Sequence, residues 1–198
     1  MKSLIFDTET TGLPITQGFN KYYSYTDLEK YNSSRLLSIC WKLYENDKLI
    51  NSNYFIIKPE EFKIDNNSYA CKINGITHEI ALSKGVSIHD IFEKLKSDFL
   101  DCNTIVAHNI NFDKHILLSE LHRYNRDDII TLFLSKRLYC TMLKGTDIAN
   151  IKYKNSNKNK FPKLIELYKF FFNEEFQNAH NAEADVEACA KCYFKMIN

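Results

Sequence analysis

The chain has 198 residues, 44% of them hydrophobic, and a formal net charge of +1, which gives it no general attraction to nucleic acid. Its length suits one domain with a sizeable core, and no stretch rich in Pro, Gly and Ser suggests a linker, so we expect a single domain over residues 1–198. No apolar run approaches the ~20 residues of a membrane span or forms a secretion signal near the start, so we expect a cytoplasmic protein without a membrane partner.

Strands dominate the first part of the predicted fold. Residues 2–8, 36–44 and 49–57 read as strands, and the turn-like pair Asn46-Asp47 joins the last two into an antiparallel meander. After a loop that holds NGIT at 74–77, Ser87 is placed to cap a helix whose apolar residues recur at helical spacing as far as Phe99.

Strands and helices alternate in the rest of the chain. A short buried strand at 103–109 is followed by a helix that starts at Asn111, and residues 138–140 read as a fifth strand. Two further helices are predicted at 163–172 and 182–197. The order predicts an α/β fold in which helices flank a mixed five-stranded sheet.

Two segments lie outside this plan. Residues 14–34 are an insertion rich in Tyr, which either borders a substrate groove or covers the edge of the sheet. Residues 144–163 contain KYKNSNKNKFPK, a basic loop rich in Asn. Its composition favours a solvated tether, and the alternative is that its lysines guide phosphates.

The six cysteines read as reduced and mostly buried thiols, because most of them lie inside apolar runs and the chain shows no export signal. Cys189 and Cys192 have the spacing of half a zinc site, but no second Cys or His pair follows at a suitable distance. Their place in a helical pattern indicates core packing, and we do not expect zinc.

Two acids lie at the carboxyl end of the first strand. Side chains two positions apart on a strand share a face, so Asp7 and Glu9 can present both carboxylates together. Such a pair is stable only beside positive charge, and hard divalent cations prefer oxygen ligands of this kind. The bland alternative, a solvated pair at a strand end, is the commoner meaning of an isolated Asp-x-Glu.

Further acids follow two later elements. Asp113 lies in the first turn of the helix after the 103–109 strand, where the helix dipole alone would explain it, but the ends of neighbouring strands bring it towards Asp7 and Glu9. Asp185 lies in the first turns of the last helix, five residues after His180, so it can hold a metal while the histidine overhangs it. The small Ala182 would let that helix approach the sheet.

These acids stand in segments that resemble a known family. FDTETTGL at 6–13, AHNINFD at 107–113 and HNAEADVEACA at 180–190 resemble, in order, the three motifs of the DEDDh proofreading exonucleases, relatives of the bacterial polymerase III epsilon subunit. YCTM at 139–142 and FPKLIELY at 161–168 also look like the family's sequence between its second and third motifs. The resemblance implies a ribonuclease H-like fold, two divalent cations (Mg²⁺ or Mn²⁺) and removal of nucleotides from a 3′ end.

The resemblance also implies a role for particular residues. The metal carboxylates fall on Asp7, Glu9, Asp113 and Asp185, and the general base that takes a proton from the attacking water falls on His180. Contacts to the terminal nucleotide fall on Thr10, Thr11, Leu13 and Phe112, and on Asn74, where relatives often carry His. His108 and Asn109 are expected to support the site.

The substrate follows less directly from these motifs. Overall similarity to the epsilon group favours an unpaired DNA 3′ end as the substrate, in proofreading or repair, with a possible polymerase or repair partner. RNA is the second choice, because backbone contacts and stacking serve both polymers. An inactive nucleic-acid-binding or polymerase-docking module is the non-enzyme alternative. Such a module would be expected to lack a metal acid, and none is missing.

Overall fold

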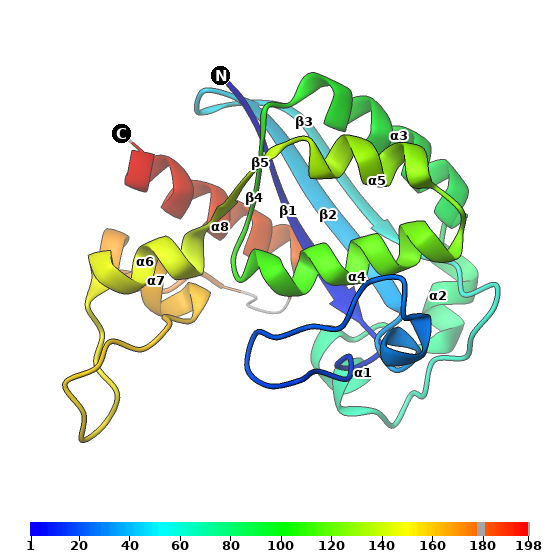
Figure 1. The fold of residues 1–198 in the computed structure, drawn as a ribbon, viewed down its shortest axis with the longest axis horizontal. Coiled ribbons are helices and arrows are strands. Elements are labelled where there is room, and N and C mark those ends of the chain that lie inside the picture. Colours follow the sequence, from blue (N-terminus) through cyan, green and yellow to red (C-terminus); the bar gives the residue numbers. More distant parts are fainter. Residues whose placement is uncertain (178–180, 198) are drawn as a thin grey trace.

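The computed structural model describes residues 1–177 and 181–197, and its centre is one sheet of five strands (Figure 1). The strands lie in the order β3-β2-β1-β4-β5. Their bounds are β1 Lys2–Thr10, β2 Leu36–Glu45, β3 Lys48–Ile56, β4 Thr104–Ala107 and β5 Arg137–Cys140. β1, β2 and β3 pair antiparallel in succession, whereas β4 runs parallel to β1 and β5 runs parallel to β4. The predicted mixed five-stranded sheet is confirmed.

Eight α-helices and one short 3₁₀ helix are found among the described residues. Their bounds are η1 Leu28–Tyr31, α1 Tyr69–Asn74, α2 His78–Lys84, α3 Ile88–Asp101, α4 Ile110–Arg123, α5 Asp127–Leu134, α6 Thr141–Ala149, α7 Leu164–Phe172 and α8 Ala182–Ile197. No described helix is both long and apolar enough to cross a membrane.

The helices cover both faces of the sheet because the strand residues alternate between two cores. Leu4 and Phe6 point to one face, where α3, α4 and α5 close the larger core (Figure 1). Ile5 and Val106 point to the other face, against which α8 packs. β1 is therefore enclosed on both sides, and its carboxyl end lies where α4 and α8 both begin.

The turn between β2 and β3 follows the prediction. Asn46 adopts a left-handed backbone conformation with φ of 57°, which Asn tolerates better than most residues, and its backbone N–H donates to the carbonyl oxygen of Met1 at 2.9 Å. Ser87 does occupy the position before α3, but its side chain forms no capping hydrogen bond, so that part of the expectation is wrong.

Four helices were not expected from the sequence. The NGIT stretch, predicted as loop, joins α1 to α2, and Gly75 ends α1 with φ of 70°. α5 follows α4 closely, and α6 begins directly after β5 and runs to Ala149, so the predicted 144–163 loop is confined to the residues after α6. α6 also packs closely on α7, since a Cβ at Gly145 would lie 2.7 Å from Leu167 Cδ1.

All six cysteines are buried free thiols, as predicted. On α8, Cys189 packs in the core between that helix and the sheet, and Cys192 packs against α7. Burial raises the pKa of the Cys192 thiol to about 12, so this side chain behaves as a small apolar group.

Candidate active site

Three carboxylates meet at the end of β1. One ligand oxygen from each of Asp7, Glu9 and Asp185 lies within 4.8 Å of the others, and the three residues are half-buried. Asp7 and Glu9 share a face because they are two positions apart on the strand. Asp185 joins them because α8 packs its buried Ala182 and Val186 against that face of the sheet. The structure thus brings together three of the four predicted metal acids.

Asp113 lies beside this group and has its own anchor. Its side chain is 3% exposed, and its Oδ1 accepts hydrogen bonds from the backbone N–H of Thr8 at 3.1 Å and from the Thr8 hydroxyl at 2.7 Å. Thr8 points to the α4 face of the sheet, whereas its neighbours in sequence point to the α8 face. Alternation along the strand was the sequence signal for this role of Thr8, which the sequence analysis missed.

Burial and mutual repulsion dominate the electrostatics of the acids. Burial raises the pKa of Asp7 well above its usual range, and the charges of Asp113, Asp185 and Glu9 add to this effect. Burial, with the charges of Asp185 and Asp113, raises the pKa of Glu9 to about 8. Burial also raises the pKa of Asp113 to about 7, although the two hydrogen bonds from Thr8 oppose the shift. Near neutral pH the negative charge of the group must therefore be neutralised, either by protons on the carboxyls or by a bound cation.

The donor atoms of this group suit a hard divalent cation. The carboxylates offer only oxygen, which Mg²⁺ and Mn²⁺ prefer over softer ligands. A cation among them would offset both the burial penalty and the repulsion that raise the three pKa values. The residues therefore fit the kind of metal that the sequence predicts. The candidate base His180 lies outside the described residues.

His108 is tied into the frame around the acids. Its Nδ1 lies 3.0 Å from the Thr141 hydroxyl oxygen, and its Nε2 lies 3.0 Å from the carbonyl oxygen of Pro162. Burial lowers the pKa of its imidazole to about 4. A neutral ring with both nitrogens engaged links the end of β4 to α6 and to the loop before α7, which agrees with a supporting role. Asn109, with φ of 64°, turns the chain from β4 into α4.

Two of the five residues predicted to meet a terminal nucleotide, Leu13 and Phe112, line a small cavity. Leu13 is 76% exposed and, with Phe112, lines a cavity of about 210 Å³. Asn74 is turned inward: its Nδ2 donates to the carbonyl oxygen of Thr10 at 3.4 Å, and its Oδ1 accepts from the backbone N–H of Ile76 at 3.0 Å. In this geometry Asn74 supports the strand end rather than presenting a free amide.

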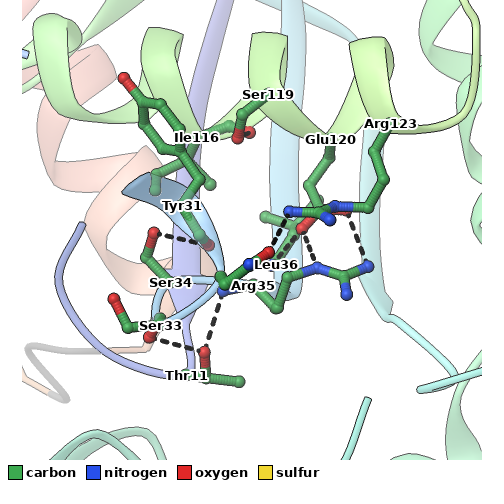
Figure 2. A network of polar contacts seen from close by, with 11 residues as sticks. Thr11, Tyr31, Ser33, Ser34, Arg35, Leu36, Ile116, Ser119, Glu120 and Arg123 are labelled. Atoms are coloured by element: carbon green, nitrogen blue, oxygen red, sulfur yellow. Dashed lines mark hydrogen bonds and ion pairs between the residues drawn. The ribbon is translucent and has the colours of Figure 1, made fainter. Parts of the chain in front are cut away.

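Thr11 is held by a buried ionic network (Figure 2). Its hydroxyl donates to the carbonyl oxygen of Ser33 at 3.0 Å and accepts from the backbone N–H of Arg35 at 2.9 Å. The Arg35 guanidinium forms two hydrogen bonds to the Glu120 carboxylate, at 2.6 and 3.2 Å, and both side chains are almost completely buried. Glu120 and Asp113 are both on α4, and Arg35 directly precedes β2. The ion pair therefore fixes the helix that carries Asp113 against the start of β2.

A larger cavity adjoins the acids. Its volume is about 560 Å³, and Asp7 and Asp185 line it together with Phe19 of the 14–34 insertion and with mainly apolar residues of the loop before α7 and of the start of α7. The insertion packs on α4, where the rings of Tyr22 and His115 stack with centroids 4.7 Å apart. Of the two roles considered for residues 14–34, the structure favours bordering a groove.

The chain matches a protein family and a curated relative over nearly its whole length. The model of the RNase_T family, described as an exonuclease, matches residues 4–193. DNA polymerase III subunit epsilon from Rickettsia conorii (strain ATCC VR-613 / Malish 7) is 25% identical over 201 residues, which cover 100% of this chain and 74% of the relative.

Solved structures of Exonuclease I from E. coli have the same fold. The complex with a dT13 oligonucleotide matches with a TM-score of 0.67 and 19% identity, over 98% of this chain and 40% of that chain. The complex with a dA16 oligonucleotide also matches with a TM-score of 0.67 and 19% identity, over 98% of this chain and 40% of that chain. The chain therefore spans about two fifths of the length of these solved proteins, and the likeness confirms the ribonuclease H-like sheet.

Proposed function

The chain belongs to the exonuclease family that its residues 4–193 match, and from this premise we propose that it removes nucleotides one at a time from unpaired DNA 3′ ends. The observation that carries the proposal is the group of Asp7, Glu9 and Asp185 within 4.8 Å of one another, with Asp113 beside it and a groove alongside. The products are nucleoside 5′-monophosphates.

The four acids are proposed to hold two divalent cations, Mg²⁺ or Mn²⁺. When bound, these cations supply positive charge for the attacking water and for the departing 3′ oxygen. Asp7 is proposed as the central ligand, because the charges of all three other acids add to burial in raising its pKa. Thr8 holds Asp113 in place, and this fixed orientation keeps the carboxylate ready for its ligand role.

His180 is proposed as the general base. An imidazole with an unperturbed pKa of ~6.5 is largely neutral near pH 7.5 and can take a proton from the attacking water. Its position directly before α8 follows from the third motif, HNAEADVEACA, whose Asp185 is one of the grouped acids.

The terminal nucleotide is proposed to lie between the acids and the small cavity. Leu13 and Phe112 offer apolar surface to its base, and Thr10 and Thr11 shape the backbone beside its sugar. Asn74 contributes through Thr10, whose carbonyl oxygen it binds.

DNA is favoured over RNA by the relatives. The Rickettsia relative is a subunit of a DNA polymerase, and two of the similar Exonuclease I structures hold dT13 and dA16 oligonucleotides. A polymerase or repair partner is proposed on the same ground. RNA is the second candidate, because stacking and backbone contacts serve both polymers.

The test is digestion of matched DNA and RNA oligonucleotides labelled at the 5′ end, with Mn²⁺ or Mg²⁺. Wild-type protein should shorten the DNA stepwise and release 5′-mononucleotides, and Asp7→Asn should abolish this. Asp147→Asn changes an exposed acid on α6 and serves as the matched control with full activity. Faster digestion of RNA would reverse the choice of substrate, and undiminished activity of Asp7→Asn would refute the metal assignment.

A further inference from the structure

An exposed aromatic pair spans the mouth of the groove beside the acids. The rings of Phe19, from the 14–34 insertion, and Phe161, from the loop before α7, stack with centroids 5.4 Å apart and planes inclined by 18°. Phe19 is 73% exposed and Phe161 is 38% exposed. Large apolar rings left at the surface beside a groove are typical of a binding surface.

Hydrogen bonds of the next residue in the chain hold each ring in place. Asn20, which follows Phe19, accepts hydrogen bonds from the Asn111 amide to its backbone and side-chain oxygens, at 3.0 and 2.9 Å. Pro162, which follows Phe161, is bound through its carbonyl oxygen to His108. Each ring is therefore held beside one of the segments that carry the site, the start of α4 or the end of β4.

Phe19 separates the two cavities of the site. The larger cavity is lined by Phe19 and Phe161 together with Asp7 and Asp185. The smaller cavity is lined by Phe19 again, but here together with Leu13 and Phe112. A chain that runs from one cavity to the other therefore passes the Phe19 ring, and in the larger cavity it lies beside Asp7 and Asp185.

We propose that Phe19 and Phe161 form a stacking platform for the base on the 5′ side of the scissile bond, which selects unpaired 3′ ends. This inference rests on the proposed function, because the terminal nucleotide must occupy the smaller cavity for the scissile phosphate to reach the acids. The penultimate nucleotide then extends into the larger cavity, where its base can continue the stack of the two rings.

The chemistry of the platform suits single-stranded nucleic acid of any sequence. Every base has a π face, so stacking on an aromatic ring tolerates all four. A base stacked on these rings has left the base stack of a duplex, so a paired end must fray before it binds. Lys163 lines the same cavity and supplies a positive charge for a backbone phosphate.

The experiment uses oligo-dT with 2-aminopurine, a fluorescent base, at the penultimate position, and Ca²⁺ in place of Mg²⁺ so that binding is read without cleavage. Wild-type protein should quench the fluorescence through stacking. Phe19→Ala and Phe161→Ala should lose the quench and bind about 5- to 150-fold more weakly, which is the effect of ~1–3 kcal/mol per stacked base. Phe170→Ala removes an exposed ring of α7 outside both cavities and should leave both readings unchanged.

Phe19→Trp and Phe19→Leu separate stacking from a structural role. Tryptophan keeps a flat ring and should restore the quench, whereas leucine keeps apolar contact but should not. Quenching that survives Phe19→Ala and Phe161→Ala, or that follows leucine as well as tryptophan, would overturn the platform. Failure of the proposed function has a different signature, namely that wild-type protein with Mn²⁺ releases no mononucleotides whatever the fluorescence shows.

Discussion

The affinity of the acid group for a divalent cation should rise steeply with pH. Burial raises the pKa of Asp113 to about 7 and, with the charges of Asp185 and Asp113, raises the pKa of Glu9 to about 8. A cation can bind these carboxylates only after their protons leave. At pH ~6 both groups are mostly protonated, and at pH ~7.5 most of the Asp113 protons and part of the Glu9 protons are lost.

The magnitude follows from proton competition at each carboxyl. Each group weakens the apparent affinity by a factor of one plus ten to the power of its pKa minus the pH. Between pH ~6 and pH ~7.5 this factor changes about 8-fold for Asp113 and about 24-fold for Glu9, so these two groups together should raise the affinity about 200-fold, and the raised pKa of Asp7 adds to the rise. Carboxyls with ordinary pKa values near ~4 would change it by only a few per cent.

The assay is calorimetric titration with Mn²⁺ at the two pH values, repeated in two buffers of different protonation enthalpy to count the protons released. Asp113→Asn should reduce the pH effect by more than about 8-fold, because it removes one titrating group and also one of the charges that raise the pKa of Glu9. Asp147→Asn, a change at an exposed acid, should retain the full effect. A wild-type ratio below about threefold would refute the reasoning, because it would mean that burial leaves these carboxyls ionised at pH ~6.

Three other changes test the stability and chemistry of the site. Metal-free protein should melt at lower temperature as pH rises from ~5 to ~8, because the raised carboxyl pKa values make the folded state bind more protons than the unfolded state, and Mn²⁺ should reverse the loss. Glu120→Gln should lower the free energy of unfolding by ~3–5 kcal/mol in urea titrations, since it leaves the buried Arg35 cation without its partner. His180→Ala should lower turnover by ~10²–10⁴-fold in single-turnover digestion without changing oligonucleotide affinity.

Each of these three predictions has a control variant or a result that would contradict it. Glu93→Gln breaks a surface ion pair with Arg126 and should cost only ~0–1 kcal/mol, so an equal effect of Glu120→Gln would contradict the buried role. For His180→Ala, equal losses of turnover and affinity would argue against a general base. A melting temperature of the metal-free protein that rises over the same pH range would contradict the pKa directions of the acids.

The strands were predictable and four of the helices were not, for a physical reason. The strands show their periodicity over a few residues, and the short connection at Asn46-Asp47 fixed the antiparallel pairing of β2 with β3. α1, α2, α5 and α6 have between six and nine residues, so a helical repeat is brief in each of them, although α7, also of nine residues, was predicted. Their stability comes from caps such as Ser68 and Thr77 and from packing on the rest of the domain.

The candidate site also has features that the sequence predicted and features that it did not. Local geometry on one strand determined that Asp7 and Glu9 share a face, and the motif pattern determined which later acids accompany them. Only the tertiary structure decided that Asp185 joins this pair directly while Asp113 is held apart by Thr8, because this depends on how α4 and α8 approach opposite faces of the sheet.

The sequence by itself determined the mixed α/β fold, the set of acids and their oxygen-only chemistry, because these follow from local periodicity and from side-chain type. Only the tertiary structure decided the pKa values of the acids, the buried pairing of Arg35 with Glu120, and the meeting of Phe19 with Phe161. Each of these depends on burial or on contacts between residues far apart in the chain, and a sequence pattern carries no information about the distance between such residues.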